Sequence, residues 1–183
     1  MDSTITRDLY EVAVGNAWLG RLSALIADYG IFLLPLALTG VWLADGRTRS
    51  TRRRAVLAGC LAAVAAMCLG VVLERTLARP RPFVALGIVP LLPHVGDSSF
   101  PSDHTLVGVA LVGMLAWHVP RVGLWLAGWA LLVGVARVTL GLHYPSDIVG
   151  SALLALVVGG VAWMLVASAL ETSPSSVRRR LGL

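Results

Sequence analysis

Residues 55–77 read AVLAGCLAAVAAMCLGVVLERTL, and this stretch decides the class of fold. It holds no charged residue before Glu74, and it is long enough for the ~20 residues that a helix needs to cross the hydrocarbon core of a bilayer. The whole chain of 183 residues is similar, with 57% hydrophobic residues, 14% charged residues and a mean hydropathy of +0.80. A soluble domain carries about 25% charged residues. The composition therefore predicts an integral membrane protein.

The rest of the chain divides into further apolar runs that polar connections separate. The predicted spans cover residues 22–44, 55–77, 104–119, 122–140 and 147–170. Ahead of them, the apolar residues of 5–17 fall on one helical face, which favours a short helix in the membrane interface, with a loose tail as the alternative. No cleavable signal peptide is apparent, and no polar stretch is long enough to fold separately. We therefore expect an all-α, polytopic transmembrane helix bundle of about five spans, forming a single domain over residues 1–183.

All the basic residues are arginines, and their placement predicts the orientation of the bundle. The 45–54 loop holds five of the fifteen, the Pro120-Arg121 turn one and the C-terminal Arg178-Arg179-Arg180 run three. With five spans these segments share one side, which the positive-inside rule makes cytoplasmic. The loops at 78–103 and 141–146 then face outward. Because the arginines lie between apolar runs and form no basic surface, we reject nucleic acid as a partner.

The two cysteines, Cys60 and Cys68, both lie inside the 55–77 run. Eight residues of helix separate them by about 12 Å, which is beyond the reach of a disulfide. Their spacing suits neither a zinc site nor a redox pair. We therefore expect both to be small core residues.

Polar residues suited to an anionic ligand occur in three segments, each at a span boundary on the predicted outer side. The segments are Arg79-Pro80-Arg81-Pro82, Ser99-Phe100-Pro101-Ser102-Asp103-His104 and Arg137-x5-His143-x3-Asp147. Arginines on this side oppose the positive-inside rule and so need another reason to be there, such as an anionic ligand. The connections between the segments are short or helical, so we expect the three to meet over one bundle.

The residue types in these segments suit chemistry at a phosphoryl group. Arginines offer forks of donors that match phosphate oxygens. Ser102 stands where a helix N-cap belongs, so the amides of the next turn could bind an anion. His104 and His143 can divide the duties of nucleophile and acid. Asp147 follows His143 by four residues, a spacing that allows a bond to the ring N–H and would fix its tautomer.

The three segments resemble the signature of the type 2 phosphatidic acid phosphatase superfamily, which reads Lys-x6-Arg-Pro, Pro-Ser-Gly-His and Ser-Arg-x5-His-x3-Asp. Here the second motif reads Pro101-Ser102-Asp103-His104 and the third Ala136-Arg137-x5-His143-x3-Asp147. The aspartate in place of glycine, and the string Gly141-Leu-His-Tyr-Pro-Ser-Asp147, look like the BcrC-type undecaprenyl-diphosphatase branch. The resemblance covers about residues 73–150 by motif and the remainder only by span pattern.

The resemblance implies a role for each of these residues. His143 would attack phosphorus and form a phosphohistidine, Asp147 would orient it, and His104 would protonate the leaving oxygen and later activate water. The phosphoryl oxygens would be held by Arg81, Ser102 and Arg137. Neither a metal nor a cofactor would be required, since arginines and helix amides neutralise the transition-state charge.

One position departs from the family pattern. Seven residues before Arg81, where the family has lysine, this chain has Glu74, which cannot bind phosphate as lysine does. Arg75 or Arg79 could take its place, and Asp103 could hold an arginine or stabilise the start of the helix. In the long loop, His94 and Asp97 either order the loop or touch a second phosphate, and the structural role is the favoured interpretation.

Residues and resemblance together predict an enzyme that hydrolyses undecaprenyl diphosphate to undecaprenyl phosphate and inorganic phosphate. Such an enzyme recycles the lipid carrier of cell-envelope and peptidoglycan synthesis and is connected with bacitracin resistance. Its expected partners are the polyprenyl diphosphate and the bilayer, with the oligomeric state left open. The expected location is the bacterial cytoplasmic membrane, with the active site facing the extracytoplasmic side.

Two other functions remain open at this point. The same motifs would serve a phosphatidate or phosphatidylglycerophosphate phosphatase, because they address the phosphoryl group and not the lipid. A non-catalytic protein that binds or transports lipid phosphates would need the arginines, but not both histidines together with Asp147.

Overall fold

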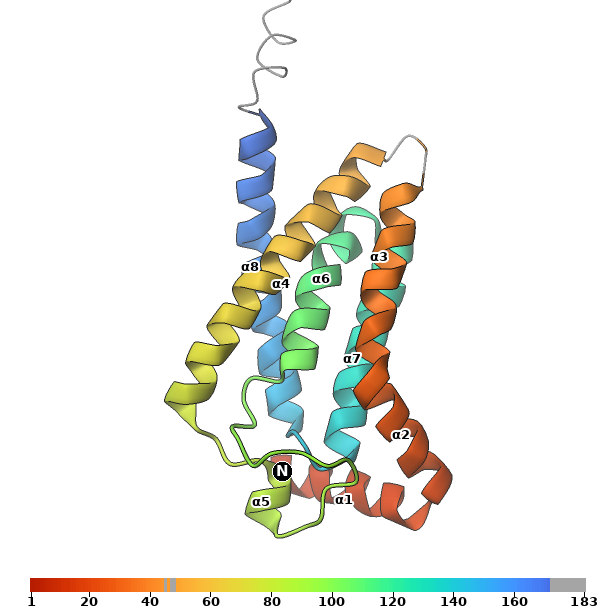
Figure 1. Ribbon diagram of the computed structural model, residues 1–183, viewed down its shortest axis with the longest axis vertical. Coiled ribbons are helices and arrows are strands. Elements are labelled where there is room, and N and C mark those ends of the chain that lie inside the picture. The colour runs from red at the N-terminus through yellow and green to blue at the C-terminus, as the bar shows by residue number, and fades with distance from the viewer. Residues whose placement is uncertain (45, 47–48, 172–183) are drawn as a thin grey trace, which may run out of the picture.

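The computed structural model describes residues 1–44, 46 and 49–171. Arg47 and Arg178–Arg180, four of the arginines that predict the orientation of the bundle, lie outside the described residues. In the described part the chain forms helices and no strand, apart from one isolated bridge between Pro80 and Ser98. The helices are α1 (Asp2–Gly15), α2 (Ala17–Tyr29), η1 (Gly30–Phe32), α3 (Leu33–Leu43), α4 (Arg49–Leu77), α5 (Pro82–Leu86), α6 (Asp103–His118), α7 (Pro120–Thr139) and α8 (Pro145–Glu171) (Figure 1). The predicted all-α bundle is confirmed.

Four helical stretches among the described residues are long and apolar enough to cross a membrane. They are Ala17–Leu43, Arg49–Leu77, Pro120–Thr139 and Pro145–Ala169. The remaining predicted span is α6, whose 16 residues extend about 24 Å, less than the hydrocarbon thickness of about 30 Å. α6 lies at the centre of the bundle, where α4, α7 and α8 pack around it (Figure 1). The chain is thus a polytopic transmembrane bundle with a short helix at its middle.

The first span differs from its prediction because a 3₁₀ turn, η1, interrupts it between α2 and α3. Pro35 has no N–H to donate to the carbonyl of Ile31, which disfavours a regular α-helix through this stretch. The Gly30 carbonyl instead accepts a hydrogen bond from Trp129 Nε1 of α7 at 2.8 Å. A Cβ atom at Gly30 would lie 2.8 Å from Val133 Cγ2, so this close approach of α7 requires glycine.

Small residues hold α4 against α6. A Cβ atom at Gly59 would lie only 2.2 Å from the carbonyl oxygen of Leu111, and the neighbouring Ala55, Ala58, Ala62 and Ala66 are all fully buried. Small side chains of this kind let helix backbones approach closely in membranes. Cys60 and Cys68 lie on other faces of α4 and are exposed, so the prediction that they are core residues is wrong.

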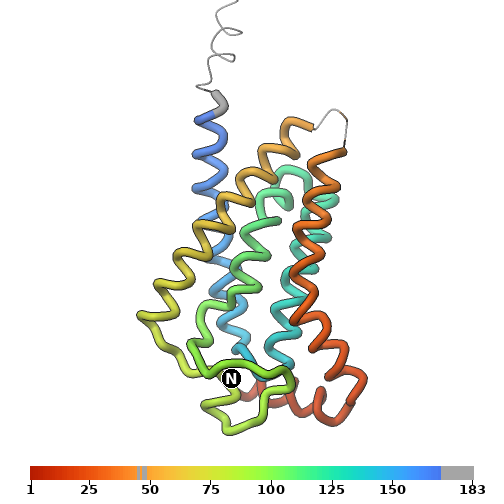
Figure 2. Tube along the Cα trace, viewed as in Figure 1, coloured from red at the N-terminus to blue at the C-terminus, as the bar shows by residue number. Residues whose placement is uncertain are grey.

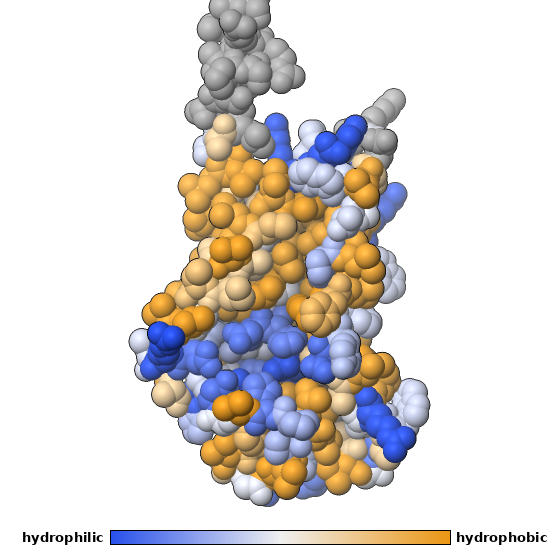
Figure 3. Space-filling model, in the orientation of Figure 1, coloured by the Kyte–Doolittle hydropathy of each residue, from blue (hydrophilic) through white to orange (hydrophobic). Residues whose placement is uncertain are grey.

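One end of the bundle is covered by α1, α5 and the 87–102 loop (Figures 1 and 2). α1 is not a loose tail, because it contacts α2, α7 and α8 and buries Thr6 and Ala13. In Figure 3, apolar surface covers the spanning helices, whereas hydrophilic atoms gather in a band near the covered end. The three motif segments lie at this end.

Candidate active site

Main-chain and serine contacts tie the motif segments together. Ser99 N donates to the Arg79 carbonyl at 2.7 Å, and Arg79 N donates to Ser98 Oγ at 3.1 Å. These bonds join the first segment to the second. Ser102 N donates to Ser151 Oγ of α8 at 2.8 Å, which joins the second segment to the helix in which the third segment ends. The predicted convergence of the segments is therefore what the structure shows.

His143 stands at the centre of this assembly and is almost completely buried. Gly141 has a φ of +76°, a conformation that suits glycine, and it turns the chain sharply between α7 and His143. The ring Nδ1 lies 2.7 Å from the Ser99 carbonyl oxygen, which can only accept, so Nδ1 carries the proton. Nε2 therefore carries no proton, and its lone pair accepts a hydrogen bond from Arg81 Nη1 at 3.1 Å.

Electrostatics keep this imidazole uncharged. Burial, followed by the nearby positive charges of Arg137 and Arg81, lowers the pKa of His143 well below its ordinary value, although the Ser99 carbonyl acts in the other direction. At neutral pH the ring is therefore neutral, as a nitrogen nucleophile must be.

Asp147 lies near the imidazole but does not make the predicted hydrogen bond to its ring N–H. Its Oδ2 lies 4.0 Å from His143 Nδ1 and accepts instead from Tyr144 N at 2.8 Å, while Oδ1 accepts from Arg79 Nη1 at 2.5 Å. The spacing rule for contacts one helical turn apart fails here because α8 begins at Pro145, which leaves His143 outside the helix. The Ser99 carbonyl fixes the tautomer, and Asp147 fixes the backbone that follows His143.

Two of the predicted phosphate ligands, Arg81 and Arg137, are buried beside His143. Arg81 Nε donates to Asp97 Oδ1 at 2.5 Å. Arg137 Nη2 lies 3.0 Å from His94 Nε2, and its buried Nε has no hydrogen-bond partner. Burial, then Arg81 and Arg137, lower the pKa of His94, so that a neutral ring accepts this bond. A buried donor without a partner is unusual and fits a site that an anion completes.

The structure gives Arg79 partners other than a phosphate. Besides Asp147, its guanidinium donates to Ser146 Oγ at 2.8 Å and to Asp2 Oδ2 at 2.8 Å, and it lies 4.3 Å above the Tyr144 ring. Burial would lower the pKa of Arg79, but hydrogen bonds and charges of Asp2 and Asp147 raise it overall. Arg79 is thus a structural cation of the site.

The start of α6 carries the remaining motif residues. Ser102 is the N-cap residue, as predicted, but its buried side chain caps no amide, and Oγ accepts from Thr105 Oγ1 at 3.2 Å. His104 is half-buried, with Arg137, His94 and Arg81 close enough to act on its charge. Arg137 and Arg81 also act on the charge of His143, so the two histidines share the same pair of guanidinium groups.

Glu74 belongs to an acidic group and not to a phosphate-binding one. Among charged side chains, Asp103, Asp97 and Arg81 act on its charge. The Asp103 side chain lies close to α4. A Cβ atom built on Gly70 of that helix would be 3.6 Å from Asp103 Oδ1. Half-buried Glu74, exposed Arg75 and Asp97 line a cavity of about 560 Å³, and Asp97 is the residue that binds Arg81. Arg75 is therefore the remaining basic residue near the position of the family lysine.

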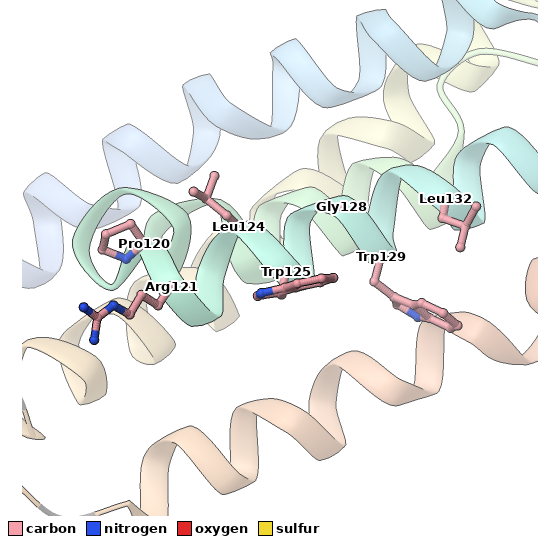
Figure 4. Close-up of a pocket in the computed structure, with 7 residues that line it drawn as sticks. All are labelled: Pro120, Arg121, Leu124, Trp125, Gly128, Trp129 and Leu132. Atoms are coloured by element: carbon pink, nitrogen blue, oxygen red, sulfur yellow. The ribbon is translucent and has the colours of Figure 1, made fainter.

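A second hollow lies away from the motif segments. It is an open groove of about 550 Å³ along α7, from Pro120 to Leu132. Figure 4 shows Trp125 and Trp129 in it, pointing from α7 towards the N-terminal helices. Its lining contains Arg121 but none of the histidines or carboxylates named above. In the described part of the chain, no three His, Cys, Asp or Glu residues are placed to hold a metal ion.

Three contributors to the site were not found from the sequence, namely Asp2, the Ser99 carbonyl and Ser151. The carbonyl belongs to the main chain and leaves no mark on residue type. Ser151 stands four residues after Asp147, which a helix reading of α8 could have placed on the same face. Asp2 lies 144 residues from its partner Ser146, and nothing in the sequence links them.

The chain is similar in sequence to known membrane proteins over most of its length. The PAP2 superfamily model matches residues 55–170. The chain is 32% identical over 159 residues to "Undecaprenyl-diphosphatase BcrC" of Bacillus subtilis, which covers 87% of this chain and 81% of that protein. It is 35% identical over 132 residues to "Bacitracin transport permease protein BcrC" of Bacillus licheniformis, covering 70% of this chain and 63% of that one.

A solved structure agrees with the sequence relatives. The fold matches the crystal structure of a transmembrane PAP2 type phosphatidylglycerolphosphate phosphatase from Bacillus subtilis with a TM-score of 0.65 and 26% identity, covering 93% of this chain and 84% of that one. The family match spans more than half of the chain and includes all three motif segments. The chain belongs to the PAP2 superfamily, and its activity is that of a membrane lipid phosphatase.

Proposed function

We propose that this protein hydrolyses undecaprenyl diphosphate to undecaprenyl phosphate and inorganic phosphate through a phosphohistidine, without a metal ion. The single observation that carries the proposal is the state of His143. It is a buried, neutral imidazole whose Nδ1–H is held by Ser99, so that the Nε2 lone pair faces Arg81. The similarity to an undecaprenyl-diphosphatase over most of both chains supports the choice of substrate.

The reaction follows in two balanced steps. His143 Nε2 attacks the terminal phosphorus, and an N–P bond forms as the bond to the bridging oxygen breaks. Undecaprenyl phosphate leaves with the electron pair of that bond, while Arg81, Arg137 and the α6 N-terminus stabilise the charge on the non-bridging oxygens. His104, which must enter this step in its protonated form, gives the leaving oxygen a proton and becomes neutral. It then takes a proton from the water that cleaves the phosphohistidine, which releases phosphate and restores both histidines.

The proposed location follows from the arginine distribution and the kind of substrate. The isoprenoid tail would remain in the bilayer while the diphosphate enters the end of the bundle that α1 and α5 cover. We place that end on the extracytoplasmic side of the bacterial cytoplasmic membrane, because the described arginines of the 49–54 segment and Arg121 lie at the opposite end.

The test is phosphate release by purified protein from undecaprenyl diphosphate in detergent, with and without a chelator. We expect the chelator to have no effect and His143→Ala to lose on the order of 10³-fold or more in kcat. Substrate labelled in the terminal phosphate should leave label on the wild-type protein after a rapid alkaline quench. Strict dependence on a divalent ion, or full activity of His143→Ala, would refute the proposal.

Two specific observations favour competing functions. The structural relative is described as a phosphatidylglycerolphosphate phosphatase, so turnover of glycerolipid phosphates belongs in the same substrate panel. A sequence relative is described as a transport permease. If His104→Ala and His143→Ala both preserved the cellular function, binding or transport would replace catalysis as the proposal.

A further inference from the structure

The first residue of α1 reaches into the candidate active site. Asp2 Oδ2 accepts from Arg79 Nη2 at 2.8 Å, and Oδ1 accepts from Ser146 N at 3.1 Å. Ser146 Oγ also donates to Oδ2. Although burial alone would raise the pKa of Asp2, the hydrogen bonds from Ser146 and Arg79 lower it overall, so the carboxylate is ionised.

One guanidinium is shared between two carboxylates in this arrangement. While Nη2 of Arg79 bonds to Asp2, its Nη1 bonds to Asp147 Oδ1 at 2.5 Å. Asp147 is completely buried, and a buried carboxylate is strongly unfavourable unless it is paired and hydrogen-bonded. The position of Arg79 therefore decides whether Asp147 can stay where it is.

The partners of this network are the residues that follow the proposed nucleophile. Asp2 holds the backbone and hydroxyl of Ser146, and Asp147 holds the backbone N–H of Tyr144. Both groups thus fix the turn immediately after His143. A nucleophile that is misplaced by about 1 Å can lose about 10²-fold in rate.

We infer that Asp2 is a positioning residue of the catalytic centre, which acts through Arg79 and Ser146 to hold Asp147 and the turn that carries His143. α1 lies outside residues 55–170, so this contribution comes from outside the part of the chain that the family model matches. The inference rests on the proposed function only in taking His143 as the reacting group.

The test compares Asp2→Asn, Asp2→Ala and Asp2→Glu with Tyr10→Phe. Tyr10 is the matched control, because its hydroxyl anchors α1 to the Val89 carbonyl at 2.7 Å without touching Arg79 or Ser146. We expect kcat to fall about 10- to 100-fold in Asp2→Asn and further in Asp2→Ala. KM should change little, because Arg81 and Arg137 bind the phosphoryl group. Asp2→Glu should recover part of kcat, and Tyr10→Phe should keep wild-type values.

Three results would overturn the inference. They are a wild-type kcat in Asp2→Ala, a loss in Tyr10→Phe equal to that in Asp2→Ala, and an effect on KM alone. The comparison uses whichever lipid phosphate the wild type hydrolyses fastest. An inactive wild type would refute the proposed function and the inference with it. An active wild type with indifferent Asp2 variants would refute the inference alone.

Discussion

Side chains of a single loop bind both arginines that are proposed to hold the phosphoryl group. Asp97 binds Arg81, and His94 accepts from Arg137. If Arg81 and Arg137 bind the phosphoryl group as proposed, Asp97 and His94 compete with it for these guanidinium groups, and the phosphate has to displace them. Asp97 is 40% exposed at its side chain, so water competes for this ion pair and limits its strength to about 1 kcal/mol.

Asp97→Asn should therefore tighten the binding of inorganic phosphate. Loss of a competitor worth about 1 kcal/mol corresponds to a decrease of about fivefold in the Ki for phosphate as a product inhibitor. Steady-state inhibition of the purified enzyme measures it, with Asp8→Asn, an exposed carboxamide substitution on α1, as the control for net charge. A weaker inhibition by phosphate would mean that Asp97 holds Arg81 in its working position.

The importance of His104 as an acid should depend on the leaving group. A lipid phosphate leaves as an anion whose conjugate acid has a pKa of about 6, whereas an alkoxide resembles hydroxide, whose conjugate acid water has a pKa of about 15.7. We expect His104→Ala to slow the first turnover of a phosphate monoester on the order of 10²-fold or more, and that of a diphosphate far less.

Rapid-quench measurement of the first turnover separates this step from the later attack of water, which is common to both substrates. His118→Ala, at the opposite end of α6, serves as the control. Equal losses for monoester and diphosphate in the first turnover would contradict an acid role for His104.

At the scale of helices, the tightest point of the α4–α6 contact is Gly59, where there is no room for a methyl group. Gly59→Ala would place Cβ about 2.2 Å from the Leu111 carbonyl, a backbone atom that can yield only if the helices separate. We expect a loss of about 1–3 kcal/mol in stability, since overpacking a tight contact costs this much. Gly128→Ala on α7 is the control, because a Cβ atom there meets nothing within 4 Å.

The apparent Tm in detergent measures this difference, at about 2–4 °C for each kcal/mol in a chain of this size. Because α6 also begins with the motif Ser102 to His104, Gly59→Ala should lower activity as well as Tm. An unchanged Tm in Gly59→Ala would show that α4 and α6 do not touch at this point.

The helices could be predicted because spanning length and hydropathy report directly on a membrane segment. Which face of each helix packs inside the bundle could not be predicted, since lipid-facing and buried residues are equally apolar. Cys60 and Cys68 show the consequence, because alanine and glycine take the packed face of α4 and leave both cysteines exposed. η1 was missed for a related reason, because the apolar run continues unbroken through Gly30–Phe32.

The site could be predicted as far as residue types report chemistry. Arg81, Arg137, His104 and His143 were predicted to lie together because outward arginines oppose the positive-inside rule and because the three segments match the family motifs, and the structure brings these residues to one end of the bundle. The partner of the imidazole could not be identified, since it is the main-chain carbonyl of Ser99. Asp147 was given the wrong partner because a spacing rule for helices was applied across the start of α8.

For the whole molecule, charge is distributed over both ends of the bundle. The described arginines at the starts of α4 and α7 mark one end, and Arg75, Arg79, Arg81 and Arg137 mark the other. At the second end Asp2, Asp97 and Asp147 pair with arginines. These ion pairs, together with the anionic substrate proposed above, would account for the positive charge at this end without a cytoplasmic location.

Cysteine labelling in bacterial cells tests the resulting orientation. Val89→Cys lies at the site end with a highly exposed side chain, and Ser50→Cys lies at the exposed start of α4 at the other end. Each is made in a Cys60→Ser, Cys68→Ser background, because both native cysteines are exposed. A membrane-impermeant maleimide should label Val89→Cys in intact spheroplasts and Ser50→Cys only after permeabilisation. The reverse pattern would put His143 on the cytoplasmic side and overturn the proposed location of the active site.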